Sequence, residues 1–172
     1  GIDDLSFEFI ASFEAEWKRQ GRGSQFQTIA IVDHAPREQY LYPEFVLFQR
    51  LFEKRGLSAI IASPAELTHR DGYLWHEERR IDLVYNRLTD FHLEQPDSLA
   101  LRSAYLAGDV VVTPNPWAHA VYANKSNLVL LSDGDLLRTW GVSDDLVRFL
   151  EGGIPRTIAV TPDCADELWS AR

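Results

Sequence analysis

Short, nearly continuous apolar runs separated by segments with helical spacing dominate the chain from residue 28 onward. Such runs are typical of strands that are covered on both faces in a parallel sheet. We predict core strands over residues 28–33, 58–62, 81–86 and 110–113, and a further strand over residues 157–160. Because helical segments separate the strands, the pattern predicts βαβ units and an α/β fold with a mostly parallel, doubly wound sheet.

The intervening segments carry apolar residues at helical intervals, and glycine or proline marks most of their ends. Helices are predicted over residues 4–20, 43–54, 95–106, 117–131, 136–140, 145–150 and 162–169. The Gly152-Gly153 pair is expected to break the helix that precedes it. Asp71-Gly72, between the runs 67–70 and 73–76, favours a two-residue hairpin turn, so a small hairpin is predicted as an insertion.

Composition limits the classes of partner. The chain has 172 residues and a formal net charge of -9, which suits a globular unit with its own core and argues against a nucleic-acid or acidic-membrane surface. No apolar run approaches the roughly 20 residues that span a bilayer. The single cysteine, Cys164, cannot form an intramolecular disulfide, and a reducing, cytoplasmic compartment is expected. The chain contains no Met, and we expect it to be an excised part of a longer protein.

Several common catalytic and cofactor motifs do not occur in the sequence. It has no G-x-G-x-x-G after the first strand, no P-loop and no G-x-S-x-G, which disfavours a dinucleotide site, a P-loop site and a serine hydrolase. The five histidines lack the spacing of metal ligands, and we assign no metal site. They are His34, His69, His76, His92 and His119.

The residues that follow the predicted strands are the candidates for ligand binding, because ligands of such sheets lie outside the carboxyl ends of the strands. These are Asp33, Asn86, Arg87 and Asn115, the last held in Pro114-Asn115-Pro116. Each is equally consistent with capping a helix or fixing a loop. Arg87 is the least ordinary of them, because a guanidinium beyond a buried strand suits a carboxylate or phosphate.

Three segments of the chain carry motifs that resemble those of a known family. The stretch from Asn115 to Asp133, with Asn115-Pro116 at its start and Asn124-Lys125 before a leucine-containing helix, resembles the passage by which glutathione-synthetase-like members of the ATP-grasp ligases leave their first domain. Ile154-Pro155-Arg156-Thr157 resembles the I-P-x-T segment that begins the nucleotide-binding part of these ligases. The strand ending in Asn86-Arg87 resembles the pre-ATP-grasp domain of the circularly permuted, glutathionylspermidine-synthetase-like group. The resemblance covers roughly residues 28–169.

The resemblance implies a three-layer, Rossmann-like pre-ATP-grasp domain over residues 28–116. A helix and linker, residues 1–27, would precede it, and a helical junction with the start of an incomplete ATP-grasp region, residues 117–172, would follow. It further implies that Lys125 contacts the nucleotide phosphates. Asp33, Asn86, Arg87 and Asn115 would form part of the wall around a small-molecule substrate.

The parent protein would use ATP and Mg²⁺ to join a carboxylate to an amine or thiol through an acyl phosphate. A second lysine, a glycine-rich loop and a magnesium-binding set are not found in this sequence, so the chain itself is expected to bind no cofactor and to be inactive. Its partner would be the missing ATP-grasp domain, and an apolar surface near residues 117–140 would favour self-association.

Two alternatives remain open. The chain is also consistent with a stand-alone binding or interaction module that recognises a small anion with Arg87 and Asn115, and with a small α/β enzyme that uses Asp33. The first alternative predicts ligand affinity in the chain by itself. The second predicts turnover that Asp33→Asn abolishes.

Overall fold

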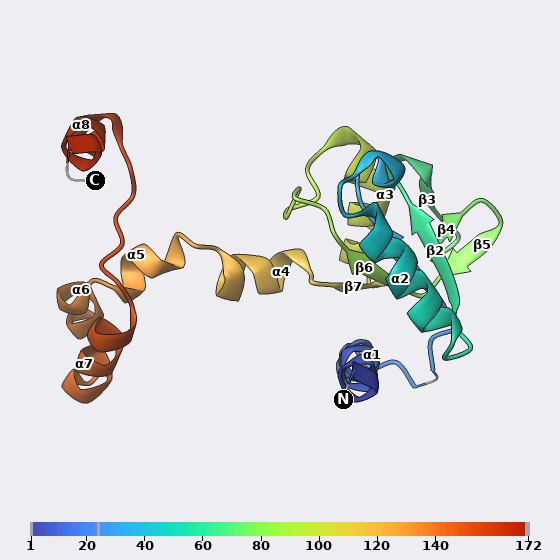
Figure 1. Cartoon of the computed structure of the whole chain (residues 1–172), viewed down its shortest axis with the longest axis horizontal. Helices are drawn as coiled ribbons and strands as arrows, with labels where there is room; N and C mark the ends of the chain where they lie inside the picture. The colour runs from blue at the N-terminus through green and yellow to red at the C-terminus, as the bar shows by residue number, and fades with distance from the viewer. Residues whose placement is uncertain (1, 24, 171–172) are drawn as a thin grey trace. The chain divides into compact units, whose positions relative to one another are not determined.

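The computed structural model describes residues 2–23 and 25–170 of the chain. The contacts divide it into two units, Gly1–Pro116 and Trp117–Arg172, and each is described by itself. The first unit is α/β, with a parallel four-stranded sheet and a small antiparallel sheet. The second is mostly helical (Figure 1).

The main sheet has the strand order β2-β1-β6-β7, and every neighbouring pair is parallel. Its strands agree with the first four apolar runs of the sequence. They are β1 (Thr28–Val32), β2 (Ser58–Ala62), β6 (Leu83–Asn86) and β7 (Val111–Thr113). Both faces of the sheet are covered, and for this reason the strands have almost no polar residues within them.

One face of the sheet packs against α1 (Ile2–Arg19) and α2 (Tyr42–Glu53). Phe13 of α1 and Phe52 of α2 meet there edge to face, with ring centroids 5.3 Å apart, together with Ile29 and Ile31 of β1. Aromatic side chains fill this layer because each buries a large apolar area. The helix α1 therefore belongs to the core of the first unit.

The other face packs against α3 (Leu99–Ala107) and the small sheet, with Leu101, Leu74 and Ile81 in the same apolar cluster. The 3-10 turn η3 (Pro96–Ser98) precedes α3, and Gly108, with φ of 72°, ends it. A left-handed residue at this position is the usual C-terminal cap of a helix, and glycine adopts it without strain.

The predicted hairpin is present and is part of a three-stranded antiparallel sheet. Its strands are β3 (Leu67–Arg70), β4 (Tyr73–His76) and β5 (Arg79–Ile81). Asp71 and Gly72 have φ of 53° and 75°, as the predicted turn requires. Two further 3-10 turns, η1 (Pro36–Glu38) and η2 (Pro64–Glu66), follow β1 and β2.

The prediction of one strand over residues 81–86 was wrong at its start. Ile81 pairs with Leu74 in the small sheet, and β6 begins only at Leu83. Between them the Asp82 carboxylate accepts hydrogen bonds from the backbone N–H groups of Gln27 and Thr28, at 2.8 and 3.1 Å. The residue that separates the two sheets is thus held by the segment entering β1.

The second unit contains helical segments joined by short turns. They are α4 (Pro116–Ala118), the π-helical turn η4 (His119–Ala123), α5 (Asn127–Leu131), α6 (Gly134–Thr139), α7 (Asp144–Gly153) and α8 (Pro162–Ser170). The predicted helix over residues 117–131 is interrupted because the Asn124 side chain accepts the Ser126 N–H, at 3.0 Å, which competes with helix formation.

Two further predictions in this unit were wrong. Residues 157–160 do not form a strand, because no strand lies beside them among the described residues of their unit, and the Thr157 N–H bonds to Ser132 Oγ at 3.0 Å. The pair Gly152-Gly153 does not break α7, which continues through both residues. The Ile154 N–H completes its last turn by bonding to the Leu150 carbonyl, at 2.7 Å.

Candidate functional site

The carboxyl ends of β1 and β6 define a topological switch point in the main sheet. From β1 the chain passes through α2 on one face to β2, and from β6 it passes through α3 on the other face to β7. Because the two connections leave in opposite directions, the general rule for open α/β sheets places the ligand-binding position at these strand ends. Asp33 directly follows β1, and Arg87 directly follows β6.

The guanidinium group of Arg87 is fixed from several sides. Nη1 donates to the Tyr85 hydroxyl at 2.9 Å, and Nη2 lies 3.0 Å from Oε1 of Glu44 in the first turn of α2. The guanidinium carbon lies 5.8 Å from the ring centroid of Phe45 and 5.4 Å from that of Tyr85. The guanidinium plane is thereby pre-oriented, and Glu44 offsets part of its charge.

Asp33 faces the charge of Arg87. Burial raises the pKa of Asp33 above its usual value, and the His34 backbone N–H together with the His34 and Arg87 charges offsets only part of this effect. The same backbone N–H donates to Asp33 Oδ1 at 2.8 Å. The switch point therefore carries one carboxyl that is easier to protonate than usual beside one fixed guanidinium.

A histidine and a second carboxylate extend this group on the α3 side. His34 Nδ1 lies 3.0 Å from Asp97 Oδ2, and Asp97 belongs to η3. The preceding loop is closed by Asp90, whose carboxylate accepts the N–H groups of Glu94 and Gln95, each at 2.9 Å. The His34–Asp97 contact thus joins the loops that follow β1 and β6.

The Asn86 side chain connects two loops at the carboxyl end of the sheet. Its Nδ2 donates to the Pro114 carbonyl at 3.2 Å, and its Oδ1 accepts the Leu88 N–H at 3.1 Å. Asn86 thereby links the end of β6 to the segment after β7, where Asn115 lies half-buried beyond a cis Thr113-Pro114 peptide bond. The structure brings Asp33 and Arg87 together and uses both polar atoms of the Asn86 side chain for loop contacts.

Lys125 lies in the second unit, in the turn between η4 and α5, with its side chain exposed. Ser132, just after α5, is bonded to Thr157 of the I-P-R-T segment: the hydroxyl donates to the Thr157 carbonyl at 3.3 Å and accepts the Thr157 N–H. Two of the segments that resemble ATP-grasp motifs are therefore held together within this unit.

The sequence analysis missed the partners of the switch-point residues, namely Glu44, Tyr85, His34 and Asp97. Glu44 follows Pro43 in the first turn of a helix, where acidic residues are common for local reasons. Its contact with a guanidinium 43 positions later in the sequence (44 to 87) depends on how α2 lies across the sheet. His34 is adjacent to Asp33 and Tyr85 is adjacent to Asn86, and this adjacency to a predicted site residue was the one available signal.

The donor set does not fit a complete Mg-ATP site. Within residues 2–23 and 25–170, no group of three or more His, Cys, Asp or Glu side chains is arranged to hold a metal ion. Lys125 supplies one exposed cation in the turn before α5. No helix within the same residues is both long enough and apolar enough to cross a bilayer.

A Ser–His–Asp chain also occurs, away from the switch point. His69 Nδ1 lies 2.9 Å from Ser103 Oγ, and His69 Nε2 lies 2.7 Å from Asp109 Oδ2. Ser103 lies within α3, where neighbouring backbone N–H groups are used by the helix and cannot stabilise an oxyanion. The arrangement therefore ties β3 to α3 and is not a hydrolase site.

Comparison with protein-family models and with curated proteins finds no match to this chain. The assignment of a function accordingly depends on the geometry of the switch point and on the motifs in the sequence.

Proposed function

We propose that this chain is the non-catalytic, substrate-binding part of an ATP-grasp ligase-like protein of the cytoplasm, with a three-layer, Rossmann-like pre-ATP-grasp fold over residues 28–116. The observation that carries the proposal is the fixed Arg87 guanidinium beside Asp33 at the switch point of the sheet. A similar fold does not by itself define a function. A pre-oriented guanidinium at the strand ends is, however, suited to binding a carboxylate or phosphate.

The switch point would form part of the wall around a small-molecule substrate. Arg87 can accept a second anionic partner through N–H groups that Glu44 and Tyr85 leave free, since a guanidinium has five donors. Asp33 would accept a hydrogen bond from an amine or hydroxyl of the same substrate. Asn86 and Asn115 would shape the loop at these strand ends. This arrangement would bind and orient the substrate.

The second unit would contribute the nucleotide contact. Lys125 is exposed and lies on the segment that resembles the family's first phosphate-binding lysine. ATP and Mg²⁺ would supply an activated acyl phosphate in the parent protein, whose remaining nucleotide-binding domain would be the partner of this chain. Such a parent would join a carboxylic acid to an amine or thiol.

The nucleotide claim is tested by titration calorimetry of Mg-ATP. The 172-residue chain is compared with a longer chain that continues through an ATP-grasp nucleotide-binding segment. We expect measurable binding only in the longer chain, and Lys125→Ala is expected to weaken it about tenfold, the effect of losing one charge-assisted hydrogen bond. Lys54→Ala removes an exposed lysine outside both candidate sites and should leave the affinity unchanged.

The claim that Arg87 forms part of a substrate-binding wall is tested separately, by NMR titration of small carboxylates into the 172-residue chain. Shifts should centre on the residues around Arg87 and should be lost in Arg87→Gln, whereas Arg50→Gln, an exposed arginine on α2, should retain them. The ATP-grasp proposal would be contradicted if neither the 172-residue chain nor the longer chain bound Mg-ATP. It would also be contradicted if Lys125→Ala left the affinity for Mg-ATP unchanged. Carboxylate binding that persisted in that case would favour the stand-alone anion-binding module.

A further inference from the structure

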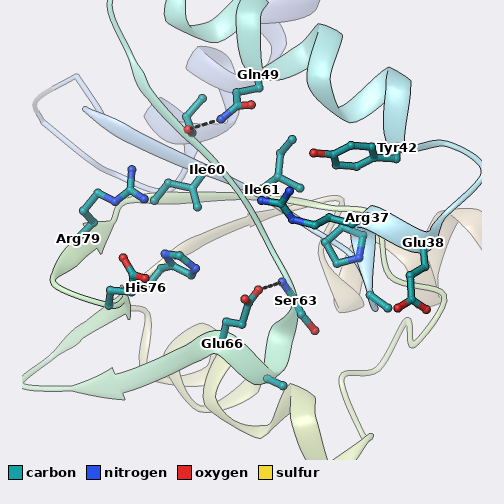
Figure 2. A pocket seen from close by; sticks show the side chains of 15 residues that line it. Arg37, Glu38, Tyr42, Gln49, Ile60, Ile61, Ser63, Glu66, His76 and Arg79 are labelled. Carbon is teal, nitrogen blue, oxygen red and sulfur yellow. Dashed lines mark hydrogen bonds between the residues drawn. The ribbon is translucent and has the colours of Figure 1, made fainter.

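A cleft of about 700 Å³ lies along the outer edge of β2, apart from the switch-point residues Asp33 and Arg87. The strand β2 forms its floor, α2 forms one wall, and the turn between β4 and β5 forms the other (Figure 2). Gln49 and Tyr42 project from α2, and His76 and Arg79 from the small sheet. The edge strand of the sheet is therefore recessed between two walls.

The recessed strand presents main-chain groups to the cleft. The Ser58 N–H bonds to the Gln27 carbonyl at 2.8 Å, and the Asp33 N–H bonds to the Ala62 carbonyl at 3.3 Å. The main-chain groups of successive residues in a strand point to opposite sides. Because those of Ser58 and Ala62 face β1, the N–H and C=O groups of Ala59 and Ile61 point away from β1, toward the cleft. The Ala59 carbonyl accepts Gln49 Nε2 at 3.0 Å. Within the described residues, the N–H groups of Ala59 and Ile61 and the Ile61 carbonyl have no hydrogen-bond partner, so they are placed to pair with a further strand.

Two arginines reach into the cleft from its opposite ends, Arg37 from η1 and Arg79 from the start of β5 (Figure 2). Neither side chain has an ion pair or hydrogen bond within the described residues. Of the acidic residues on the walls, Glu66 is engaged by the Ser63 N–H at 2.6 Å, and Glu38 points away from the strand in Figure 2. Glu77 lies in the turn between β4 and β5.

We propose that this cleft binds an extended peptide segment with an acidic residue toward each end, which adds to the edge of β2. Edge strands accept added strands through main-chain hydrogen bonds, and the neighbouring side chains give specificity. The five residues of β2 span about 16 Å, so a segment of similar length would bring its two carboxylates toward Arg37 and Arg79.

The shape of the cleft decides between this occupant and a second copy of the chain. If two copies of the chain paired through their β2 strands, both strand edges would have to protrude from the surface. In this chain β2 lies between α2 and the turn that joins β4 to β5. Two recessed edges cannot meet, whereas one isolated extended segment can enter between the walls. The same feature protects the edge from unspecific sheet extension.

The test uses fluorescence polarisation with the full chain. The probe is a labelled peptide of about seven residues with alternating valine and threonine and a glutamate toward each end. We expect saturable binding that Arg37→Ala and Arg79→Ala each weaken by up to about fivefold, and the double variant by about tenfold or more, the range for exposed ion pairs. Arg50→Ala, outside the cleft, is the matched control and should bind as the unchanged chain does.

Three further results separate the proposed mode from others. In NMR, the amide signals of Ala59 and Ile61 should shift and become protected from exchange when the peptide binds. A peptide with lysines in place of the glutamates should bind much more weakly, and so should one with a central proline that removes a main-chain donor. The proposal would be overturned if the lysine peptide or the proline peptide bound as tightly as the glutamate peptide. It would also be overturned if millimolar succinate displaced the peptide fully, or if neither arginine substitution changed the affinity.

Discussion

At the scale of single residues, the position of Asp33 makes it a source of pH dependence. Burial raises its pKa, so the native state holds the proton more tightly than the unfolded chain does. Stability then falls as the pH rises from the ordinary carboxyl range through the raised pKa, and at neutral pH the charged group weakens the fold. The chain tolerates this cost at a position where the charges of His34 and Arg87 partly offset the effect of burial on the pKa of Asp33.

Asp33→Asn is therefore expected to raise the melting temperature near pH 7 and to leave it nearly unchanged near pH 3. The amide Oδ1 still accepts the His34 N–H, while the buried charge is lost. Solvent screening of the half-buried group keeps the gain below about 1 kcal/mol. Circular dichroism during heating at both pH values measures the effect, and a variant less stable than the unchanged chain near pH 7 would contradict the sign.

Cys164 provides a second prediction at this scale. The hydroxyl and then the N–H of Thr161 lower the pKa of its thiol, and the N–H lies 3.3 Å from the sulfur. The rate of alkylation by iodoacetamide should thus rise with a midpoint below the usual value of about 8.5. Thr161→Val should move the midpoint upward, whereas Thr139→Val, which removes a hydroxyl from α6, should not. An unchanged midpoint in Thr161→Val would exclude the hydroxyl as the cause.

At the scale of elements, Asp82 decides where the small sheet ends and the main sheet begins. Its side chain is 12% exposed and accepts two main-chain N–H groups at the start of β1. Asp82→Ala leaves both donors without their acceptor and should reduce the free energy of unfolding by about 2 kcal/mol. Asp82→Asn keeps one acceptor oxygen and should cost less.

Urea denaturation measures the effect of Asp82. Asp135→Ala is the matched control, because the carboxylate of Asp135 is 99% exposed and its ion pair should contribute almost nothing. If the Ala variants at both positions lost the same stability, the proposed role of Asp82 in joining the two sheets would be wrong.

At the scale of the whole molecule, both apolar clusters lie in the first unit, within residues 10–112. A chain that ends at Pro116 contains every residue of both clusters. We expect it to fold alone, with a cooperative thermal transition and a near-ultraviolet dichroism spectrum that reports its packed aromatic residues. Loss of that spectrum with retention of secondary structure would show that the second unit is needed for packing.

The second unit exposes several large apolar side chains. Trp117, Tyr122, Trp140 and Phe149 are 61%, 75%, 59% and 75% exposed. Exposed aromatic groups of this size favour association. Sedimentation of the full chain should thus depend on concentration, whereas that of the chain ending at Pro116 should not. A full chain that remained monomeric at high concentration would contradict this expectation and, with it, the predicted self-association surface.

Features that depend on neighbouring residues could be predicted from the sequence. Apolar runs located the four parallel strands, and Asp71-Gly72 located a turn that requires positive φ. The positions of Asp33 and Arg87 after their strands also followed from local pattern, because a strand end is visible in the sequence. Parallel strands then bring their carboxyl ends to one edge without further information.

The contacts between segments that are distant in the sequence could not be predicted and became visible in the folded chain. Ile81 joined the small sheet because Leu74 lies opposite it. Residues 157–160 formed no strand because the described residues of their unit contain no other strand. The contact of Glu44 with Arg87 and the cleft along β2 likewise join parts of the chain that are separate in the sequence. Pairing across such separations depends on the packing of whole elements, and local spacing carries no record of it.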